Sequence, residues 1–163
     1  MRQSVYVLHV PTRGPGLVPI GRLLDQFLAS EGQGTMGGGQ DDGLLTLFCQ
    51  HTSASLTIQE NADPDVRLDL QDGLAALAPH GRALGAAEPY RHATEGPDDM
   101  AAHLRAALTG VQLSIPVFGG ALALGTWQGV YLWEHRDGPQ RRRVACHLLL
   151  SPRGGRRGTG SER

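Results

Sequence analysis

The apolar residues of this chain fall into short runs that glycine and proline separate, and this spacing limits the folds available to it. Most of the runs have the length of a strand, and none reaches the eighteen residues or more of a membrane-spanning helix. Strands do not alternate regularly with helices, and no sequence repeats. The pattern predicts a single α+β domain over residues 1–150, with a large, mainly antiparallel sheet packed by a few helices. The expected strands are Ser4–Val10, Leu44–Cys49, Val111–Val117, Ala121–Leu124, Gly129–Glu134 and Arg143–Leu150, with a last hairpin at Asp137-Gly138.

Three segments are helical by their spacing or their start signals. Residues Ile20–Ala29 repeat apolar side chains at helical intervals, and Asp63-Pro64 offers a capping carboxylate followed by a proline that suits the first turn. A third helix, about Asp98–Leu108, places His103 one turn beyond Asp99. Val66, Leu70, Leu74 and Leu77 form the expected buried stripe of the second helix, and Asp65, Asp69 and Asp72 its solvated face.

Glycine-rich segments and charge set the limits of the domain. Residues Glu31–Gly43 form an expected flexible connection, and residues 151–163 an expected disordered Gly/Arg-rich tail. Without that tail, eleven arginines face fifteen acidic residues, and this acidic body argues against a nucleic-acid partner. We expect no membrane contact and a cytoplasmic location, since the start of the sequence lacks the apolar stretch of a signal peptide.

All fifteen basic residues are arginine, which excludes a lysine Schiff base, a lysine nucleophile and a P-loop lysine. The two cysteines, Cys49 and Cys146, lie in apolar runs and are expected to be buried thiols. A serine nucleophile beside His51 is disfavoured, because no Gly-x-Ser-x-Gly turn is present.

Histidines and carboxylates gather where elements are expected to end. His51 follows a strand, His92 and Glu95 precede a helix, and Asp98 and His103 lie in its first turns. Imidazole and carboxylate ligands are typical of a divalent metal site with an open position. These residues can equally have structural roles, as a helix cap or as a partner of the helix dipole.

The run Arg141-Arg142-Arg143 leads into the last strand, where Arg142 faces away from its two neighbours. One face of the strand can therefore bind an anion such as phosphate. A charged, solvated sheet edge explains the run equally well.

Four motifs occur in order and together closely resemble the YjbQ family, also described as the secondary thiamine-phosphate synthase family. They are His51-Thr52-Ser53-Ala54 with Glu60-Asn61-Ala62-Asp63-Pro64, Tyr90-Arg91-His92-Ala93-Thr94-Glu95-Gly96, Asp98-Asp99-Met100-Ala101-Ala102-His103, and Leu124-Gly125-Thr126-Trp127-Gln128. The resemblance runs from about Val5 to Leu150, and it does not include the glycines at 37–39 or the Arg-rich tail.

The resemblance implies an α+β fold and a homotrimer with polar clefts near subunit boundaries. It also implies condensation of hydroxymethylpyrimidine pyrophosphate with thiazole phosphate, giving thiamine phosphate and pyrophosphate, as the main or a side activity. Under this hypothesis the catalytic residues are Glu60, His51, His103 and Asp98, and the metal ligands are His51, His92 and His103. Ser53, Asn61, Glu95, Trp127, Gln128 and Arg142 are the expected contacts of the phosphorylated small-molecule substrate.

The synthase hypothesis favours Mg²⁺ as the cofactor, whereas the cluster of histidines also suits Zn²⁺. Two alternatives use the same residues. One is a metal- or anion-binding module without turnover, and the other is a metal-dependent phosphohydrolase.

Overall fold

A computed structural model describes residues 1–32 and 41–151 of the protein. These residues form eight strands and three helices. In chain order the elements are β1 (Arg2–Thr12), β2 (Gly16–Pro19), α1 (Gly21–Gly32), β3 (Asp42–Cys49), β4 (Ala54–Glu60), α2 (Pro64–Leu77), α3 (Asp99–Thr109), β5 (Gln112–Phe118), β6 (Ala121–Leu122), β7 (Gln128–Glu134) and β8 (Gln140–Ser151). The expected tail from residue 152 onward lies outside the described residues, as does most of the expected connection between the first helix and β3.

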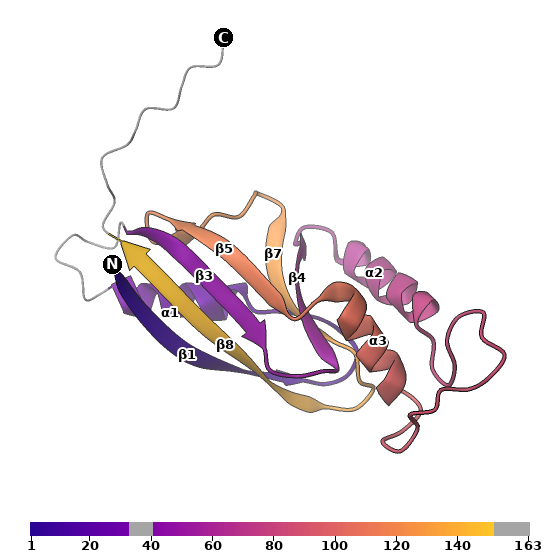
Figure 1. Ribbon diagram of the computed structural model, residues 1–163. Helices are drawn as coiled ribbons and strands as arrows, with labels where there is room; N and C mark the ends of the chain where they lie inside the picture. The colour runs from indigo at the N-terminus through magenta and orange to yellow at the C-terminus, as the bar shows by residue number, and fades with distance from the viewer. Residues whose placement is uncertain (33–40, 152–163) are drawn as a thin grey trace, which may run out of the picture.

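The strands form two antiparallel sheets, and the α+β prediction is confirmed (Figure 1). The larger sheet has the strand order β1-β8-β3-β5-β6, and the smaller sheet has the order β2-β7-β4. In Figure 1, α1 lies behind the larger sheet, while α2 and α3 lie together at one end of the molecule. The helix α3 contacts β4, and α2 contacts β2. No helix covers the front of the larger sheet in this view, among the residues described.

The core lies between the two sheets and α1. Side chains alternate along a strand, so the inward positions of β8 bury Val144, Cys146 and Leu148 while the intervening ones reach the open face. Ile20, directly before α1, and Leu24, Phe27 and Leu28 of the helix join the same core, as their spacing predicted, whereas Leu23 of the same predicted apolar face is 37% exposed. Both cysteines are buried free thiols, which confirms their expected state.

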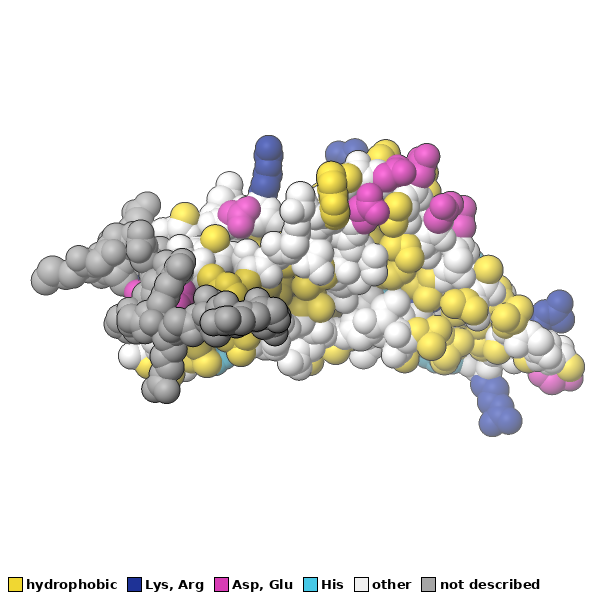
Figure 2. Space-filling model, turned by 90° about the horizontal axis from the view of Figure 1, so that it is seen from above, with side chains coloured by type: hydrophobic (Ala, Val, Ile, Leu, Met, Phe, Trp, Pro, Cys, Tyr) yellow, Lys and Arg dark blue, Asp and Glu magenta, His cyan; other side chains and the backbone are white. Residues whose placement is uncertain are grey.

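The helix α2 begins as its sequence predicted. Asp63 is the N-cap and accepts a hydrogen bond from the Asp65 main-chain nitrogen at 2.9 Å, and Pro64 occupies the first turn. The expected buried stripe is only partly present, because Leu74 is buried whereas Leu77 is 61% exposed. The acidic face is confirmed: Asp65, Asp69 and Asp72 are exposed, and Figure 2 shows acidic side chains gathered at this end of the molecule.

One prediction about the strands was wrong, and two strands were missed. Asp137-Gly138 does not close a hairpin, because β7 pairs with β2 and β4 while β8 pairs with β1 and β3. The chain instead crosses from one sheet to the other between residues 134 and 140. The strands β2 and β4 were not predicted at all. The first is only four residues long between prolines, and in the second, single apolar residues such as Leu56 alternate with polar ones.

A buried ion pair joins the two sheets at this crossing. Glu134, at the end of β7, is fully buried, and its carboxylate accepts hydrogen bonds from Arg142 of β8 and from the hydroxyl of Thr12 of β1, the latter at 2.8 Å. The Arg142 guanidinium also donates to the Ser53 carbonyl at 3.3 Å. Burial raises the pKa of Glu134, but the hydrogen bonds from Arg142, Arg136 and Thr12 outweigh that effect and lower it, so the carboxylate is charged at neutral pH.

We expect Arg142→Met to lower the free energy of unfolding by about 3–5 kcal/mol, because Glu134 would remain buried without its cation. The matched control is Arg141→Met on the exposed face of the same strand, which should change stability by less than about 0.5 kcal/mol. Urea denaturation at a fixed protein concentration measures both. The double variant Glu134→Gln/Arg142→Met should recover part of the loss. Equal losses in Arg142→Met and Arg141→Met would contradict this role of the ion pair.

Candidate functional site

Three side chains that can ligate a metal ion meet at the first turn of α3. Asp99 opens the helix, His103 lies one turn later, and His92 comes from the loop before it. Asp99 Oδ2 lies 2.7 Å from His92 Nε2 and 3.4 Å from His103 Nε2. The three possible ligand atoms lie within 4.8 Å of one another. The Asp99 side chain is only 2% exposed, whereas those of His92 and His103 are 44% and 33% exposed, so this metal-ligand group opens to solvent on the histidine side.

Arg136 fixes the orientation of the carboxylate in this group. Its guanidinium donates to Asp99 Oδ1, to Asp98 Oδ2 at 2.8 Å and to the Glu95 carbonyl at 2.9 Å. Because Oδ1 of Asp99 is engaged by Arg136, Oδ2 is left facing the two imidazoles. The arginine thus holds one acidic oxygen in position for a cation.

The tautomer of His103 is set by a main-chain contact. Its Nδ1 lies 2.9 Å from the Thr52 carbonyl oxygen, which can only accept, so Nδ1 carries the proton. The lone pair of a neutral ring then lies on Nε2, the nitrogen nearest to Asp99. A ligand histidine in a metal site is held in the same way by a carbonyl behind it.

The donor set of the metal-ligand group suits a particular class of cation. Two imidazole nitrogens and one carboxylate oxygen are the ligands of Zn²⁺ and related first-row divalent ions, whereas Mg²⁺ binds mainly oxygen. Three protein ligands also leave a coordination position for a substrate. The group therefore fits Zn²⁺ better than the Mg²⁺ favoured by the synthase hypothesis.

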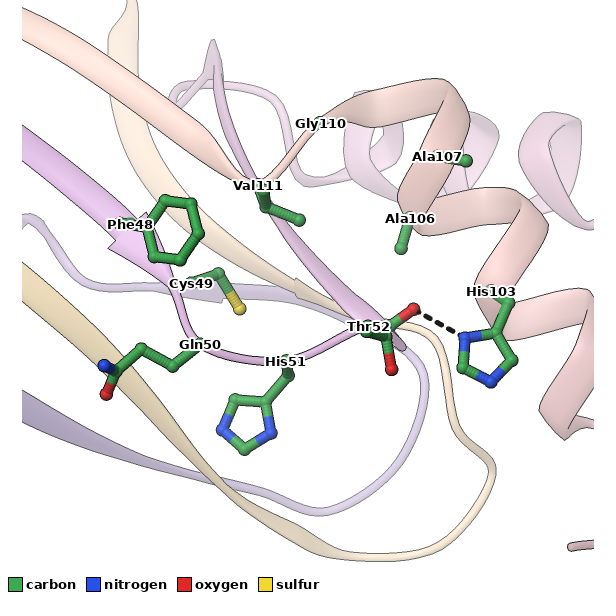
Figure 3. Close-up of a pocket in the computed structure, with 10 residues that line it drawn as sticks. All are labelled: Phe48, Cys49, Gln50, His51, Thr52, His103, Ala106, Ala107, Gly110 and Val111. Carbon is green, nitrogen blue, oxygen red and sulfur yellow. Dashed lines mark hydrogen bonds between the residues drawn. The ribbon is translucent and has the colours of Figure 1, made fainter.

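An open cavity of about 750 Å³ adjoins the group (Figure 3). His103 lies at one side of it, and its other lining residues are Phe48, Cys49, Gln50, His51, Thr52, Ala106, Ala107, Gly110 and Val111. Apolar side chains from β3, from α3 and from the segment before β5 line most of this space, with the two histidines as its ionisable groups apart from a buried thiol. Such a cavity suits a small molecule with an apolar or aromatic part.

His51 lines the cavity but lies outside the metal-ligand group. Its Nε2 accepts a hydrogen bond from the Arg143 main-chain nitrogen at 2.8 Å, so this nitrogen is not free to ligate a metal. Burial lowers the pKa of His51, and the positive charges of Arg142 and Arg143 lower it further against the opposing effect of Glu134. The ring is therefore neutral at pH 7.

Asp98 is positioned near the metal-ligand group, but its Oδ2 has other partners. Its Oδ2 accepts from Arg136 and, at 3.0 Å, from the Asp137 main-chain nitrogen. Burial raises the pKa of Asp98, yet these hydrogen bonds outweigh it and the pKa is lowered. The carboxylate that faces the imidazoles belongs to its neighbour Asp99, which was not among the predicted site residues.

Arg142, predicted as a substrate contact, has protein partners. Its side chain is buried, and its guanidinium is occupied by Glu134 and by the Ser53 carbonyl. Ser53 is itself buried beneath the site, and Glu95 is an exposed residue whose carboxylate lies 3.9 Å from the Arg136 guanidinium.

Four of the predicted residues lie at the opposite end of the smaller sheet. Glu60 of β4 pairs with Gln128 of β7, whereas the other end of the same ladder pairs Ala54 with Glu134. Six residues of strand separate these ends by about 20 Å. Asn61 donates to the Gln128 carbonyl at 3.1 Å, and Trp127 is 65% exposed beside them. One subunit therefore does not bring this distal cluster of Glu60, Asn61, Trp127 and Gln128 to the metal-ligand group.

The residues that support the site from behind were not predicted from the sequence. Glu134, His135 and Arg136 are consecutive at the end of β7, and a run of charged residues directly after an apolar strand was the available signal. The spacing of Asp99 and His103 by one helical turn was the signal for the ligand pair.

His135 belongs to a buried network beneath the cavity. Its Nε2 lies 2.8 Å from the Ser55 hydroxyl, which in turn lies 2.7 Å from the Thr109 hydroxyl at the end of α3. Among the described residues, no group pairs with His135 Nδ1, and the ring is fully buried. Burial and the positive charge of Arg105 lower the pKa of His135 to about 4, so the fold keeps this ring neutral.

No helix within residues 1–32 and 41–151 has both the length and the apolar character needed to cross a membrane. This finding agrees with the absence of long apolar runs in the sequence.

Known proteins similar to this chain cover nearly all of it. A family model described as UPF0047 protein YjbQ-like matches residues 8–151. The UPF0047 protein sll1880 of Synechocystis is 47% identical over 148 residues, which are 90% of this chain and 92% of that protein. The UPF0047 protein YugU of Bacillus subtilis is 35% identical over 139 residues, 85% of this chain and 92% of its own length.

Solved structures show the same similarity. A conserved hypothetical protein from Thermus thermophilus is 41% identical, with a TM-score of 0.72 over 88% of this chain and 99% of its own. An uncharacterized protein of the yjbq/upf0047 family from Clostridium acetobutylicum is 34% identical, with a TM-score of 0.70 over 90% of this chain and 99% of its own.

We expect stability to fall as the pH is lowered from 6.5 towards 4, and His135 to contribute to the fall. In that range the unfolded histidine, with a pKa near 6.5, binds a proton that the folded one, with a pKa of about 4, does not, and the protonated unfolded state gains on the order of 3 kcal/mol. Urea denaturation across this range should show a shallower pH dependence for His135→Gln. His147→Gln, at a partly exposed imidazole of the larger sheet, is the control and should keep the full slope. Identical slopes in the wild type and His135→Gln would contradict the expectation.

Proposed function

The chain belongs to the YjbQ-like UPF0047 family, and from this premise we propose that it binds a divalent metal ion through His92, Asp99 and His103 and acts with it on a phosphorylated small molecule. The observation that carries the proposal is the convergence of two imidazoles and one oriented carboxylate beside an open, largely apolar cavity. A metal supplies charge neutralisation to a phosphate or pyrophosphate group, and the cavity supplies a place for the organic part.

The specific reaction that we propose is the synthase reaction implied by the family resemblance. The bond between the pyrimidine methylene carbon and the pyrophosphate oxygen breaks, and its electron pair leaves with pyrophosphate. The thiazole nitrogen forms the new bond to that carbon, which yields thiamine phosphate. This chemistry needs no protein nucleophile, so positioning and electrostatic stabilisation carry the catalysis.

Within this proposal, residues around the site position the metal ligands and the substrate. Arg136 keeps Asp99 turned towards the ligand histidines, and the Thr52 carbonyl accepts from His103 Nδ1, which leaves Nε2 as the nitrogen that can ligate the metal. Phe48 and Val111 give the cavity apolar walls against which the organic part of the substrate can pack.

The predicted roles of the distal cluster require a second subunit. Glu60, Asn61, Trp127 and Gln128 can join the site only if another copy of the chain presents them, which is the arrangement expected of a homotrimer. The uncovered face of the larger sheet supports such an assembly, because it exposes Val5, Leu44 and Phe48, with Phe118 at its edge. Phe48 also lines the cavity, so the same face reaches the site.

Hydrolysis of a phosphate ester is the second candidate, favoured by the open position that three protein ligands leave for water. Binding of a ligand without turnover is the remaining outcome. These candidates share the metal-ligand group, and substrate turnover separates them.

We expect the purified, chelator-stripped protein to bind one Zn²⁺ per chain and to prefer it to Mg²⁺, as measured by calorimetry and by metal analysis. His92→Ala should weaken Zn²⁺ binding by roughly 100-fold or more, since loss of even an outer partner of a ligand costs about 10–100-fold. The matched control is His147→Ala, which removes a partly exposed histidine of the larger sheet and should leave affinity unchanged. Equal affinities in the wild type and His92→Ala would overturn the metal site.

We expect the metal-loaded protein to form thiamine phosphate and pyrophosphate from the two precursors, and Glu60→Gln and His103→Ala each to lose this activity. If the distal cluster acts from a neighbouring subunit, co-expression of the two variants should restore roughly a quarter of the wild-type rate, because some sites then contain both intact residues. Restoration by co-expression is not expected if both residues act within one subunit. Phosphate release from single precursors without condensation would favour the hydrolase, and no turnover would favour a binding module.

A further inference from the structure

The three consecutive arginines of β8 differ in their surroundings. Arg142 points into the core and is neutralised by Glu134, whereas Arg141 and Arg143 are exposed on the open face of the larger sheet. Within residues 1–32 and 41–151, neither exposed guanidinium forms an ion pair. The open face thus presents two positive charges that the described residues leave uncompensated.

Arg143 differs from Arg141 in its link to the cavity. Its main-chain nitrogen donates to His51 Nε2 at 2.8 Å, and its carbonyl accepts from the Gln50 main-chain nitrogen at 3.0 Å. Its guanidinium is also near enough for its charge to lower the pKa of His51. Arg141 lies two residues further along the strand, opposite Pro11 of β1, and contacts none of these groups.

His51 adds a hydrogen-bond donor. A neutral ring whose Nε2 accepts a hydrogen bond must carry its proton on Nδ1. Among the described residues, no acceptor takes this Nδ1 proton, and His51 lines the cavity together with Phe48 and Val111. His51 thus brings a neutral N–H donor to the cavity lining, and main-chain hydrogen bonds join His51 and Gln50 of that lining to Arg143, whose exposed guanidinium has no ion-pair partner among the described residues.

We propose that Arg143 and His51 form an anion subsite at the rim of the cavity, which binds the phosphate group of a ligand whose apolar part fills the cavity. The guanidinium supplies charge and a forked set of donors that match phosphate oxygens, and the imidazole supplies a second donor. The inference deepens the proposed function and rests on it for treating the cavity as the substrate site. It gives the substrate two anchors, the metal-ligand group beside His103 and this subsite beside His51.

The test is calorimetric titration of the full-length, chelator-stripped protein with inorganic phosphate and with phenyl phosphate at constant ionic strength. We expect phenyl phosphate to bind more tightly, because its ring enters the apolar cavity. Arg143→Gln should weaken phenyl phosphate binding about tenfold or more, as expected for loss of a charge-assisted hydrogen bond. The matched control is Arg141→Gln, which removes the same charge from the same face and should change the affinity less than about twofold.

A second variant addresses the imidazole. His51→Phe keeps a ring but removes the donor and should weaken binding by several-fold, with unchanged thermal unfolding as the check on folding. Equal weakening by Arg143→Gln and Arg141→Gln would reduce the effect to general surface charge and overturn the subsite, as would wild-type affinity in Arg143→Gln.

Failure of the subsite can be separated from failure of the metal function. The titrations with phosphate use metal-free protein, and Zn²⁺ binding is measured separately on the same wild-type preparation. Loss of Zn²⁺ binding with phosphate binding intact, or the reverse, shows which of the two proposals fails.

Discussion

The buried pair of Glu134 and Arg142 is the interaction on which the site depends. A buried ion pair contributes little net stability, because the cost of removing two charges from water offsets their attraction. Its value here is geometric: it clamps the end of β7 in the smaller sheet to β8 in the larger one. The second oxygen of Glu134 also accepts hydrogen bonds from the main-chain nitrogens of His135 and Arg136, both at 3.0 Å, which fixes the path of the chain as it leaves β7.

That fixed path aims Arg136 at the start of α3. The guanidinium reaches Asp98, Asp99 and the Glu95 carbonyl, so a residue of the smaller sheet sets the orientation of a carboxylate on a helix. Two of the three possible metal ligands belong to that helix and share its rigidity, whereas His92 comes from a loop. Ligands on rigid elements hold their geometry without the ion, and the loop ligand is the one free to adjust to it.

Features that depend on neighbouring residues, such as helix positions, could be predicted from the sequence. Features that depend on contacts between distant residues, such as side-chain orientation at the site and strand pairing, could not. The helical spacing of Ile20 to Leu28 and the capping pair Asp63-Pro64 were sufficient for α1 and for the start of α2. The choice between adjacent acids was not local, since Arg136, 37 residues further along the chain, turns Asp99 rather than Asp98 towards the imidazoles. Alternation likewise predicted that Arg142 faces away from Arg143, but only the position of Glu134 across the sheets determines which of them is buried. The partition of strands into two sheets was missed for the same reason.

The short segment Gln50–Thr52 connects the two halves of the cavity. Its first residue donates to the Arg143 carbonyl, the ring of His51 accepts from the Arg143 nitrogen, and the Thr52 carbonyl holds His103. A segment outside regular secondary structure is thus pinned to β8 on one side and to α3 on the other. Because it also lines the cavity, any shift of this segment would move the donor of His51 and change the tautomeric preference of His103 together. Three contacts of main-chain atoms therefore set the distance between the proposed anion subsite and the metal-ligand group. A ligand that binds both must have a length that matches this distance.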